Sequence, residues 1–149
     1  MTKRTGFMEE ALEEARRSAE RGEIPVGAVL VMNGTIIARS GNRTRVENDV
    51  SAHAEIVVIR EASRLLQQER LDGADLYVTL EPCTMCAGAI SFARIRRLYY
   101  AAEDPKGGAV DNGVRFFCQP TCHHAPDVYS GLAESESAQL LTSFFKSRR

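Results

Sequence analysis

The first stretch of the chain has the spacing of apolar and charged residues that is typical of an amphipathic helix. Apolar side chains recur at intervals of three and four residues, and Glu and Arg fill most of the positions between them. The apolar positions are Phe7, Met8, Ala11, Leu12, Ala15 and Ala19. Gly22 follows, and we expect it to end the helix because glycine readily adopts the left-handed conformation of a helix terminus.

A hairpin pattern comes next. Residues 26–32 form an apolar, β-branched run, Asn33-Gly34 follows it, and residues 35–40 continue beyond. Asn-Gly between two such runs is the strongest short signal for a β-hairpin. Two antiparallel strands joined by a tight turn are therefore predicted.

Helical and extended patterns alternate after the hairpin. The mostly polar residues 41–51 predict a surface loop, with Ser51 as the N-cap of the helix that follows. The remaining predicted elements are a helix over 52–68, a strand over 74–80, a helix over 82–93, a strand over 95–102, a glycine-rich loop over 104–113, an irregular segment over 114–131 and a final helix over 133–149. This order predicts right-handed crossovers and an α/β fold with helices on both faces of a sheet.

Composition restricts the class of protein. With 149 residues, of which 44% are hydrophobic and 26% charged, the sequence fits one globular domain, residues 1–149. We expect no signal peptide and no membrane span, because the longest apolar run, residues 24–32, is too short. A cytoplasmic location is expected, where the four cysteines are more often metal ligands or free thiols than disulfides. The net charge of −1 neither indicates nor excludes a nucleic-acid partner.

Two short stretches contain residues suited to a divalent metal. His53 lies at the start of one predicted helix, and Cys83 and Cys86 lie in the first turn of the next. Unpaired backbone N–H groups and the helix dipole stabilise thiolates there, and a spacing of three lets both sulfurs reach one ion. Structural zinc sites usually have four protein ligands, whereas three ligands leave a position for water. The pattern therefore predicts a catalytic zinc site.

Glu55 stands two residues from the predicted histidine ligand. A glutamate in the first turn of a helix often serves only to complement the helix dipole. Beside a metal ion, the same carboxylate can take a proton from water and return it later. Because Glu55 accompanies three candidate ligands, we expect a catalytic role.

His53-Ala54-Glu55 together with Pro82-Cys83-x-x-Cys86 resembles the signature of the zinc-dependent cytidine deaminase superfamily. Further blocks, over nearly the whole chain, are similar to those of bacterial tRNA-specific adenosine deaminases. These blocks are residues 25–29, 41–42, 53–56, 80–89, 104–108 and 144–145. The resemblance implies a cytidine deaminase-like α/β fold, a three-layer α/β/α sandwich around a mixed five-stranded sheet.

The same resemblance implies an activity. Such enzymes convert the wobble adenosine in the anticodon stem-loop of a tRNA to inosine, and they act as homodimers. One Zn²⁺ per subunit would be held by His53, Cys83 and Cys86, and zinc-activated hydroxide would attack C6 of adenine with release of ammonia. Glu55 would move the protons between water and the base.

Substrate contacts are implied as well. The residues are Val26, Asn42, Ala54, Asp104, Lys106, His123, His124, Phe144, Phe145 and Arg148. Val26 and Ala54 would line the base pocket, and Asn42 would hydrogen-bond the flipped base. Asp104 and Lys106 would contact the sugar and the neighbouring backbone. The two histidines would face the anticodon loop, and the C-terminal residues would offer it a stacking surface and positive charge.

Simpler explanations exist for several of these residues. Gly-Asn is a frequent loop pair, so Asn42 can be a turn residue, and Asp104 can serve in a turn or a helix cap. The C-terminal phenylalanines can belong to an amphipathic helix with a solvated basic end. Cys118 and Cys122, followed by two histidines, do not have a familiar metal-site spacing, so free thiols and capping or substrate-facing histidines are expected instead.

Two other functions compete with the deamination of tRNA. A zinc-dependent deaminase of a free base or nucleoside, such as guanine or cytosine, would use the same chemistry without needing the basic C-terminus. A non-catalytic, zinc-stabilised binding module would need the three ligands but not Glu55.

Overall fold

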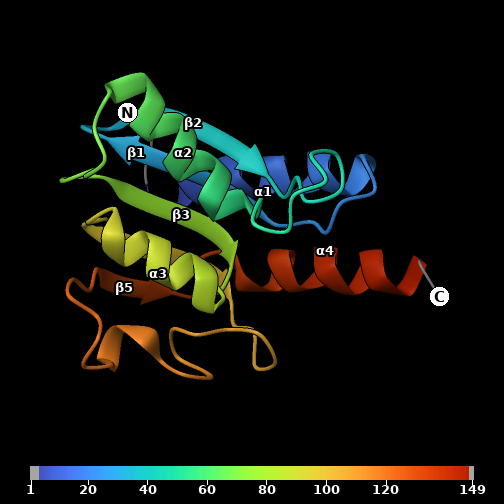
Figure 1. The fold of residues 1–149 in the computed structure, drawn as a ribbon. Coiled ribbons are helices and arrows are strands. Elements are labelled where there is room, and N and C mark those ends of the chain that lie inside the picture. The colour runs from blue at the N-terminus through green and yellow to red at the C-terminus, as the bar shows by residue number, and fades with distance from the viewer. Residues whose placement is uncertain (1–3, 148–149) are drawn as a thin grey trace.

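The computed structural model describes residues 4–147. Helices and strands alternate along this range, as Figure 1 shows. In order they are α1 (Arg4–Glu20), β1 (Gly27–Met32), β2 (Thr35–Gly41), α2 (Ala54–Leu66), β3 (Asp75–Leu80), α3 (Thr84–Phe92), β4 (Arg97–Ala102), the 3₁₀ helix η1 (Phe116–Cys118), β5 (Asp127–Ser130) and α4 (Glu134–Ser147). Within the described range, no helix combines the length and apolar character that crossing a membrane requires.

The strands form one sheet in the order β2-β1-β3-β4-β5. β1 runs antiparallel to both of its neighbours, whereas β4 runs parallel to β3 and β5 runs parallel to β4. The mixed five-stranded sheet implied by the resemblance is therefore confirmed.

Successive side chains of a strand point to opposite faces of the sheet. Both sets are apolar here, so the sheet is apolar on both faces. Leu30 and Leu76 belong to one cluster of buried side chains, and Val29 and Tyr77 belong to the other. Helices α2 and α3 cover the first face, in front of the sheet in Figure 1, while α1 packs on the second face. α4 contacts α1, β3 and β4 and then extends past the ends of the strands. The predicted α/β/α layering is confirmed.

Two glycines let α1 approach the sheet closely. Gly27 and Gly41 are paired across β1 and β2. A Cβ atom on Gly27 would lie 1.9 Å from the carbonyl oxygen of Ala11, and one on Gly41 would lie 1.7 Å from Ser18 Oγ. Neither overlap can be accommodated without moving the helix, so the two positions require glycine. This approach fixes the chain where it enters β1 and where it leaves β2.

The predicted turns are confirmed at both tested positions. Gly22 follows α1 with φ +80°, in the left-handed region that ends many helices. Asn33 and Gly34 have φ +51° and +75°, which is the conformation of the tight hairpin turn between β1 and β2.

The prediction that residues 114–131 are irregular is wrong in part. This segment contains η1 and the edge strand β5. The strand was not visible in the sequence because most of its side chains are exposed, so it has no apolar alternation. Its conformation depends on pairing with β4, which is a tertiary contact.

The predicted starts of three helices also need correction. His53, and not Ser51, is the N-cap of α2, because the Ser51 hydroxyl donates a hydrogen bond of 2.6 Å to Asp49 Oδ1 in the preceding turn. α3 begins at Thr84, after the N-cap Cys83, rather than at residue 82. α4 begins at Glu134, and residues 148–149 of the predicted last helix lie outside the described range.

Candidate metal centre and substrate cavity

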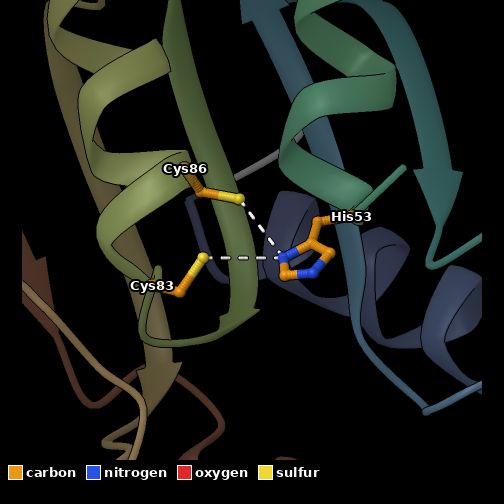
Figure 2. Close-up of side chains that lie close together, drawn as sticks. All are labelled: His53, Cys83 and Cys86. Atoms are coloured by element: carbon orange, nitrogen blue, oxygen red, sulfur yellow. Dashed lines mark hydrogen bonds between the residues drawn. The ribbon is translucent and has the colours of Figure 1, made fainter. Parts of the chain in front are cut away.

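His53 and Cys83 occupy the same place in their helices. Each is an N-cap residue with extended backbone, at φ −68° and ψ 154° for His53 and φ −75° and ψ 178° for Cys83. Neither side chain caps its own helix. Since α2 and α3 lie side by side on one face of the sheet, the two side chains are directed toward each other (Figure 2).

Cys86, one helical turn further along α3, completes the group. His53 Nδ1 lies 3.6 Å from Cys83 Sγ and 3.5 Å from Cys86 Sγ, and the three ligand atoms all lie within 4.8 Å of one another. In a tetrahedral zinc site, bonds of about 2.0–2.1 Å to nitrogen and about 2.3 Å to sulfur place these atoms roughly 3.6 Å apart. The spacing and the donor set therefore fit one Zn²⁺, as the sequence predicted.

The electrostatics of the three groups favour binding of a cation. The hydrogen bond from Cys86 lowers the pKa of Cys83 to about 4, despite partial burial, and His53 contributes in the same direction. The same thiol pair and burial raise the pKa of Cys86, and the hydrogen bond with Cys83 raises the pKa of His53. Closely packed donor atoms of this kind release their protons when a divalent cation binds to them.

Glu55 lies in the first turn of α2, next to these residues. Its side chain is only 3% exposed, and burial raises its pKa to about 7. Among the described residues, its Oε1 atom has no hydrogen-bond partner. A buried carboxylate oxygen without a partner is costly in a purely structural role, so this atom indicates a ligand.

A cavity of about 170 Å³ opens beside Glu55. Its lining includes seven of the predicted site residues, namely Val26, Asn42, His53, Ala54, Glu55, Cys83 and Asp104. Residues next to β1, β2 and α3, residues at the start of α2, and a residue of the loop after β4 thus meet around one space.

The sequence did not identify four other lining residues, which are Ile24, Thr44, Leu80 and Glu81. Ile24 and Leu80 have the pattern of ordinary apolar core residues, although Ile24 is 41% exposed. No sequence pattern singles out Thr44. Its link to the site appears only in the structure, where its hydroxyl accepts a hydrogen bond of 3.2 Å from Asn42 Nδ2.

Asn42 is held firmly at the cavity wall. Its backbone N–H donates to the carbonyl oxygen of Val26 at 2.9 Å, and its own carbonyl accepts a hydrogen bond of 3.2 Å from the buried Ser18 hydroxyl. These bonds leave the side chain to face the cavity, together with Thr44.

Asp104 has a turn role as well as a place in the cavity wall. Its Oδ1 accepts hydrogen bonds from the backbone N–H groups of Lys106 at 3.2 Å and Gly107 at 3.0 Å. The simpler explanation considered for Asp104 therefore holds alongside its position at the cavity. Whether its carboxylate also contacts substrate stays a prediction.

Two wider hollows adjoin the cavity. The first, which we call the Phe144 hollow, is about 370 Å³ and is lined by Glu23, Ile24, Asn42, Thr44, Arg45, Phe144 and Phe145. The second, which we call the Lys106 hollow, is about 760 Å³ and is lined by Ile24, Leu80, Glu103, Asp104, Lys106, Leu141 and Phe145. Ile24 lines all three spaces, so they form one continuous surface that the end of α4 borders.

The structure does not bring the two histidines to this surface. His124 Nε2 hydrogen-bonds the carbonyl oxygen of Ile95 at 2.7 Å, and the His124 carbonyl accepts a bond of 2.6 Å from Ser91 Oγ. His123 is exposed and lines none of the three spaces. Arg148 lies outside the described residues, and the RNA contacts of these residues stay predictions.

The second group of cysteines does not form a metal cluster. Among residues 4–147, the group of three or more potential ligand atoms within reach of one ion is the one at His53. Cys118 is exposed, and the Cys122 thiol donates to the carbonyl oxygen of His124 at 3.1 Å. Both are free thiols, as expected from their spacing.

Comparison with known proteins agrees with this geometry. Residues 1–102 match the family model of the cytidine and deoxycytidylate deaminase zinc-binding region. A tRNA-specific adenosine deaminase of Agrobacterium fabrum is 74% identical over 149 residues, which cover 100% of this chain and 98% of that one. The corresponding enzyme of Bacillus subtilis is 45% identical, covering 100% of this chain and 92% of that one.

A solved structure supports the same assignment. It comes from work on A-to-I editing by tRNA:A34 deaminases at the wobble position of transfer RNA, and it matches with a TM-score of 0.92 at 78% identity. The match covers 93% of this chain and 100% of that one. The chain therefore belongs to the tRNA-specific adenosine deaminases, a family within the zinc-dependent cytidine deaminase superfamily.

Proposed function

We propose that this protein hydrolyses the wobble adenosine of a tRNA anticodon to inosine, with water as the co-substrate and ammonia as the second product. The observation that carries the proposal is the unpartnered Oε1 of buried Glu55, in a cavity beside three zinc-ligand atoms. Relatives that are 74% and 45% identical over the whole chain are tRNA-specific adenosine deaminases.

The residues around the cavity have separate roles in this reaction. His53, Cys83 and Cys86 hold the metal, and bound zinc lowers the pKa of water and so supplies a nucleophile at neutral pH. Glu55 would take one proton from the attacking water and give it to N1 of the adenine. It would then take the second proton, from the new hydroxyl on C6, and give it to the amino group, which leaves as ammonia. Its burial supports this role, because a raised pKa lets a carboxyl group both accept and donate a proton near neutral pH.

The cavity walls orient the base. Asn42, which the backbone of Val26 and the hydroxyl of Ser18 hold in place, offers its amide to the edge of the ring. Val26 and Ala54 supply apolar walls, and Ala54 is fully buried. A fixed position of the ring places C6 toward the metal centre and N1 toward Glu55.

The adjoining hollows favour RNA over a free base. A free guanine or cytosine needs only the inner cavity, yet that cavity continues into two larger spaces bordered by an exposed phenylalanine, Phe145, and by basic side chains, Arg45 and Lys106. Aromatic side chains stack on neighbouring bases, and Arg and Lys bind phosphates. These features suit the nucleotides on either side of a flipped base.

We also propose a homodimer of a single deaminase domain, residues 1–149, acting in the cytoplasm. Two apolar side chains support an interface with a second copy, since Phe92 at the end of α3 is 74% exposed and Val50 before α2 is 89% exposed. Large apolar side chains so exposed often mark an interaction surface. Light scattering should give twice the mass of one chain, and Phe92→Glu should reduce it to that of a monomer.

The proposed reaction is tested with a panel of substrates. An anticodon stem-loop with a wobble adenosine, free adenosine, guanine and cytosine are each incubated with zinc-loaded protein, and release of ammonia is measured. Release from the stem-loop alone is expected. Release from guanine or cytosine, with none from the stem-loop, would favour the free-base deaminase instead.

A further inference from the structure

Glu81 is a buried carboxylate to which the proposed chemistry assigns no role. It follows β3 directly and stands two residues before the ligand Cys83. The residue is 2% exposed, yet it lines the substrate cavity. A charge this deeply buried must be compensated by hydrogen bonds.

Five N–H donors surround the Glu81 carboxylate, and all come from loop 104–112. Oε1 accepts from the backbone N–H of Asp104 at 2.9 Å and from Asn112 Nδ2 at 2.6 Å. Oε2 accepts from the backbone N–H groups of Val110 at 3.0 Å, Asp111 at 2.9 Å and Asn112 at 3.1 Å. The Glu81 side chain thus binds both ends of the loop.

The loop also lies directly against Glu81. A Cβ atom on Gly108 would be 2.5 Å from Glu81 Cδ and 2.6 Å from the carbonyl oxygen of Asp104. The backbone N–H of Ala109 donates to the carbonyl oxygen of Pro82 at 2.9 Å, one residue before the zinc ligand Cys83. The loop is therefore fastened to the segment that leads into α3.

Because both oxygens are engaged, Glu81 has no lone pair directed at a substrate proton. The loop that it holds carries Asp104 into the cavity wall and Lys106 into the adjoining Lys106 hollow. We propose that Glu81 is a positioning residue for the deaminase, which acts by fixing loop 104–112 and so placing Asp104 and Lys106 against the RNA. This inference rests on the proposed function.

The test is the variant Glu81→Gln. A glutamine amide keeps the shape of the side chain but replaces one oxygen with a donor, so at least two of the five N–H groups lose their acceptor. We expect kcat/KM for the stem-loop to fall on the order of tenfold, mainly through KM, with zinc content unchanged. Faster hydrogen exchange is expected at the backbone amides of Val110, Asp111 and Asn112.

Glu23, a buried glutamate that lines the Phe144 hollow, provides a matched control. It is 1% exposed and accepts hydrogen bonds from the backbone N–H groups of Arg45 at 3.1 Å and Val46 at 2.9 Å. Glu23→Gln should therefore disturb a different loop and leave hydrogen exchange in loop 104–112 unchanged. The comparison separates a specific effect on that loop from a general loss of stability.

Coupling with Asp104 distinguishes positioning from a merely structural role. If Glu81 acts through loop 104–112, the two substitutions remove the same contact. The double variant Glu81→Gln/Asp104→Ala should then have the same kcat/KM as the less active single variant, within about twofold. For Glu23→Gln and Asp104→Ala, the factors by which the single variants lower kcat/KM should multiply in the double variant. Multiplied effects for Glu81, or a fall in kcat with KM unchanged, would overturn the proposal.

Two further measurements distinguish failure of the Glu81 proposal from misfolding of the variant and from failure of the proposed function. If Glu81→Gln does not fold, Asn112→Ala removes one donor to Oε1 and should raise KM by a smaller factor, again coupled to Asp104→Ala. If the wild-type protein does not deaminate the stem-loop, the proposed function fails. Hydrogen exchange in loop 104–112 does not depend on turnover, and unchanged exchange in the Glu81 variant would refute the anchoring role by itself.

Discussion

His53 Nδ1 and Cys83 Sγ lie 3.6 Å apart although 30 residues separate them in the sequence. The contact exists because each residue is the N-cap of a helix on the same face of the sheet. The metal centre is thus formed by two adjacent helix starts, and the partial positive charge at these ends favours thiolate ligands. Several tests follow from this arrangement and from the residues around it.

Zinc binding should depend on Cys86 and not on Cys118. Cys86→Ser exchanges a buried soft sulfur ligand for a hydroxyl, so the zinc content measured by atomic absorption should fall well below one per chain. Cys118→Ser, at an exposed free thiol, should keep the wild-type content of one. Full zinc in the Cys86 variant would contradict the ligand assignment.

Glu55→Gln should remove activity without removing zinc. The amide retains the shape of the side chain but cannot accept a proton, so kcat should fall by about 10²–10⁴-fold. Glu61→Gln, at a partly exposed residue of the same helix that pairs with Arg64, should have near-normal kcat. A fully active Glu55 variant would contradict the proton-transfer role assigned to Glu55.

Charged and aromatic contacts with RNA should be separable by their dependence on salt. Lys106→Ala should weaken binding of the stem-loop and lower the slope of log K against log salt by about one, because one phosphate contact is lost. Phe145→Ala should weaken binding by about 1–3 kcal/mol with the slope unchanged, since stacking releases no counterions.

Arg64→Ala is the control for this experiment. Arg64 is exposed in the last turn of α2, at the end away from His53. Neither the affinity nor the slope should change. A slope that is the same in the wild type and the Lys106 variant would place the phosphate contacts elsewhere.

Gly41→Ala should damage both stability and activity. The added Cβ would overlap Ser18 Oγ and would lie 2.7 Å from the carbonyl oxygen of Glu14, so α1 must move, at a cost of about 1–3 kcal/mol. Asn42, the next residue, would move with it, and KM for the stem-loop should rise.

Gly73→Ala provides the comparison, because Gly73, unlike Gly41, has positive φ and has open space around it. It should cost about 1–2 kcal/mol in the urea-unfolding free energy through backbone strain alone, without a change in KM. Equal effects of the two variants on KM would show that Asn42 is not held through Gly41.

The sequence predicted those parts of the fold in which apolar periodicity and local turn chemistry agree. The hairpin at Asn33-Gly34 and the helix ending before Gly22 are examples, since each signal acts over a few residues. β5 was not predicted, because an exposed edge strand gains its structure from its neighbour and not from its own pattern.

The residues of the candidate site also divide into those that local sequence patterns predict and those that only tertiary contacts reveal. His53, Cys83 and Cys86 could be predicted because metal binding restricts both residue type and spacing, and Glu55 was predicted from its place beside them. Glu81 could not, because its importance depends on five hydrogen bonds to residues 23 to 31 positions later, which no local pattern reveals. His124, which the resemblance places near the RNA, bonds the carbonyl oxygen of Ile95, and its contact with RNA stays a prediction.

The most direct test of the proposed function is the position of inosine in a whole tRNA. A transcript with adenosine at the wobble position and other adenosines in the anticodon loop is incubated with the zinc-loaded protein and then sequenced, since inosine is read as guanosine. Complete conversion at the wobble adenosine alone is predicted, because the cavity at Glu55 accepts one flipped base while the adjoining hollows hold its neighbours. An unmodified transcript, together with consumption of free guanine or cytosine by the same preparation, would contradict it.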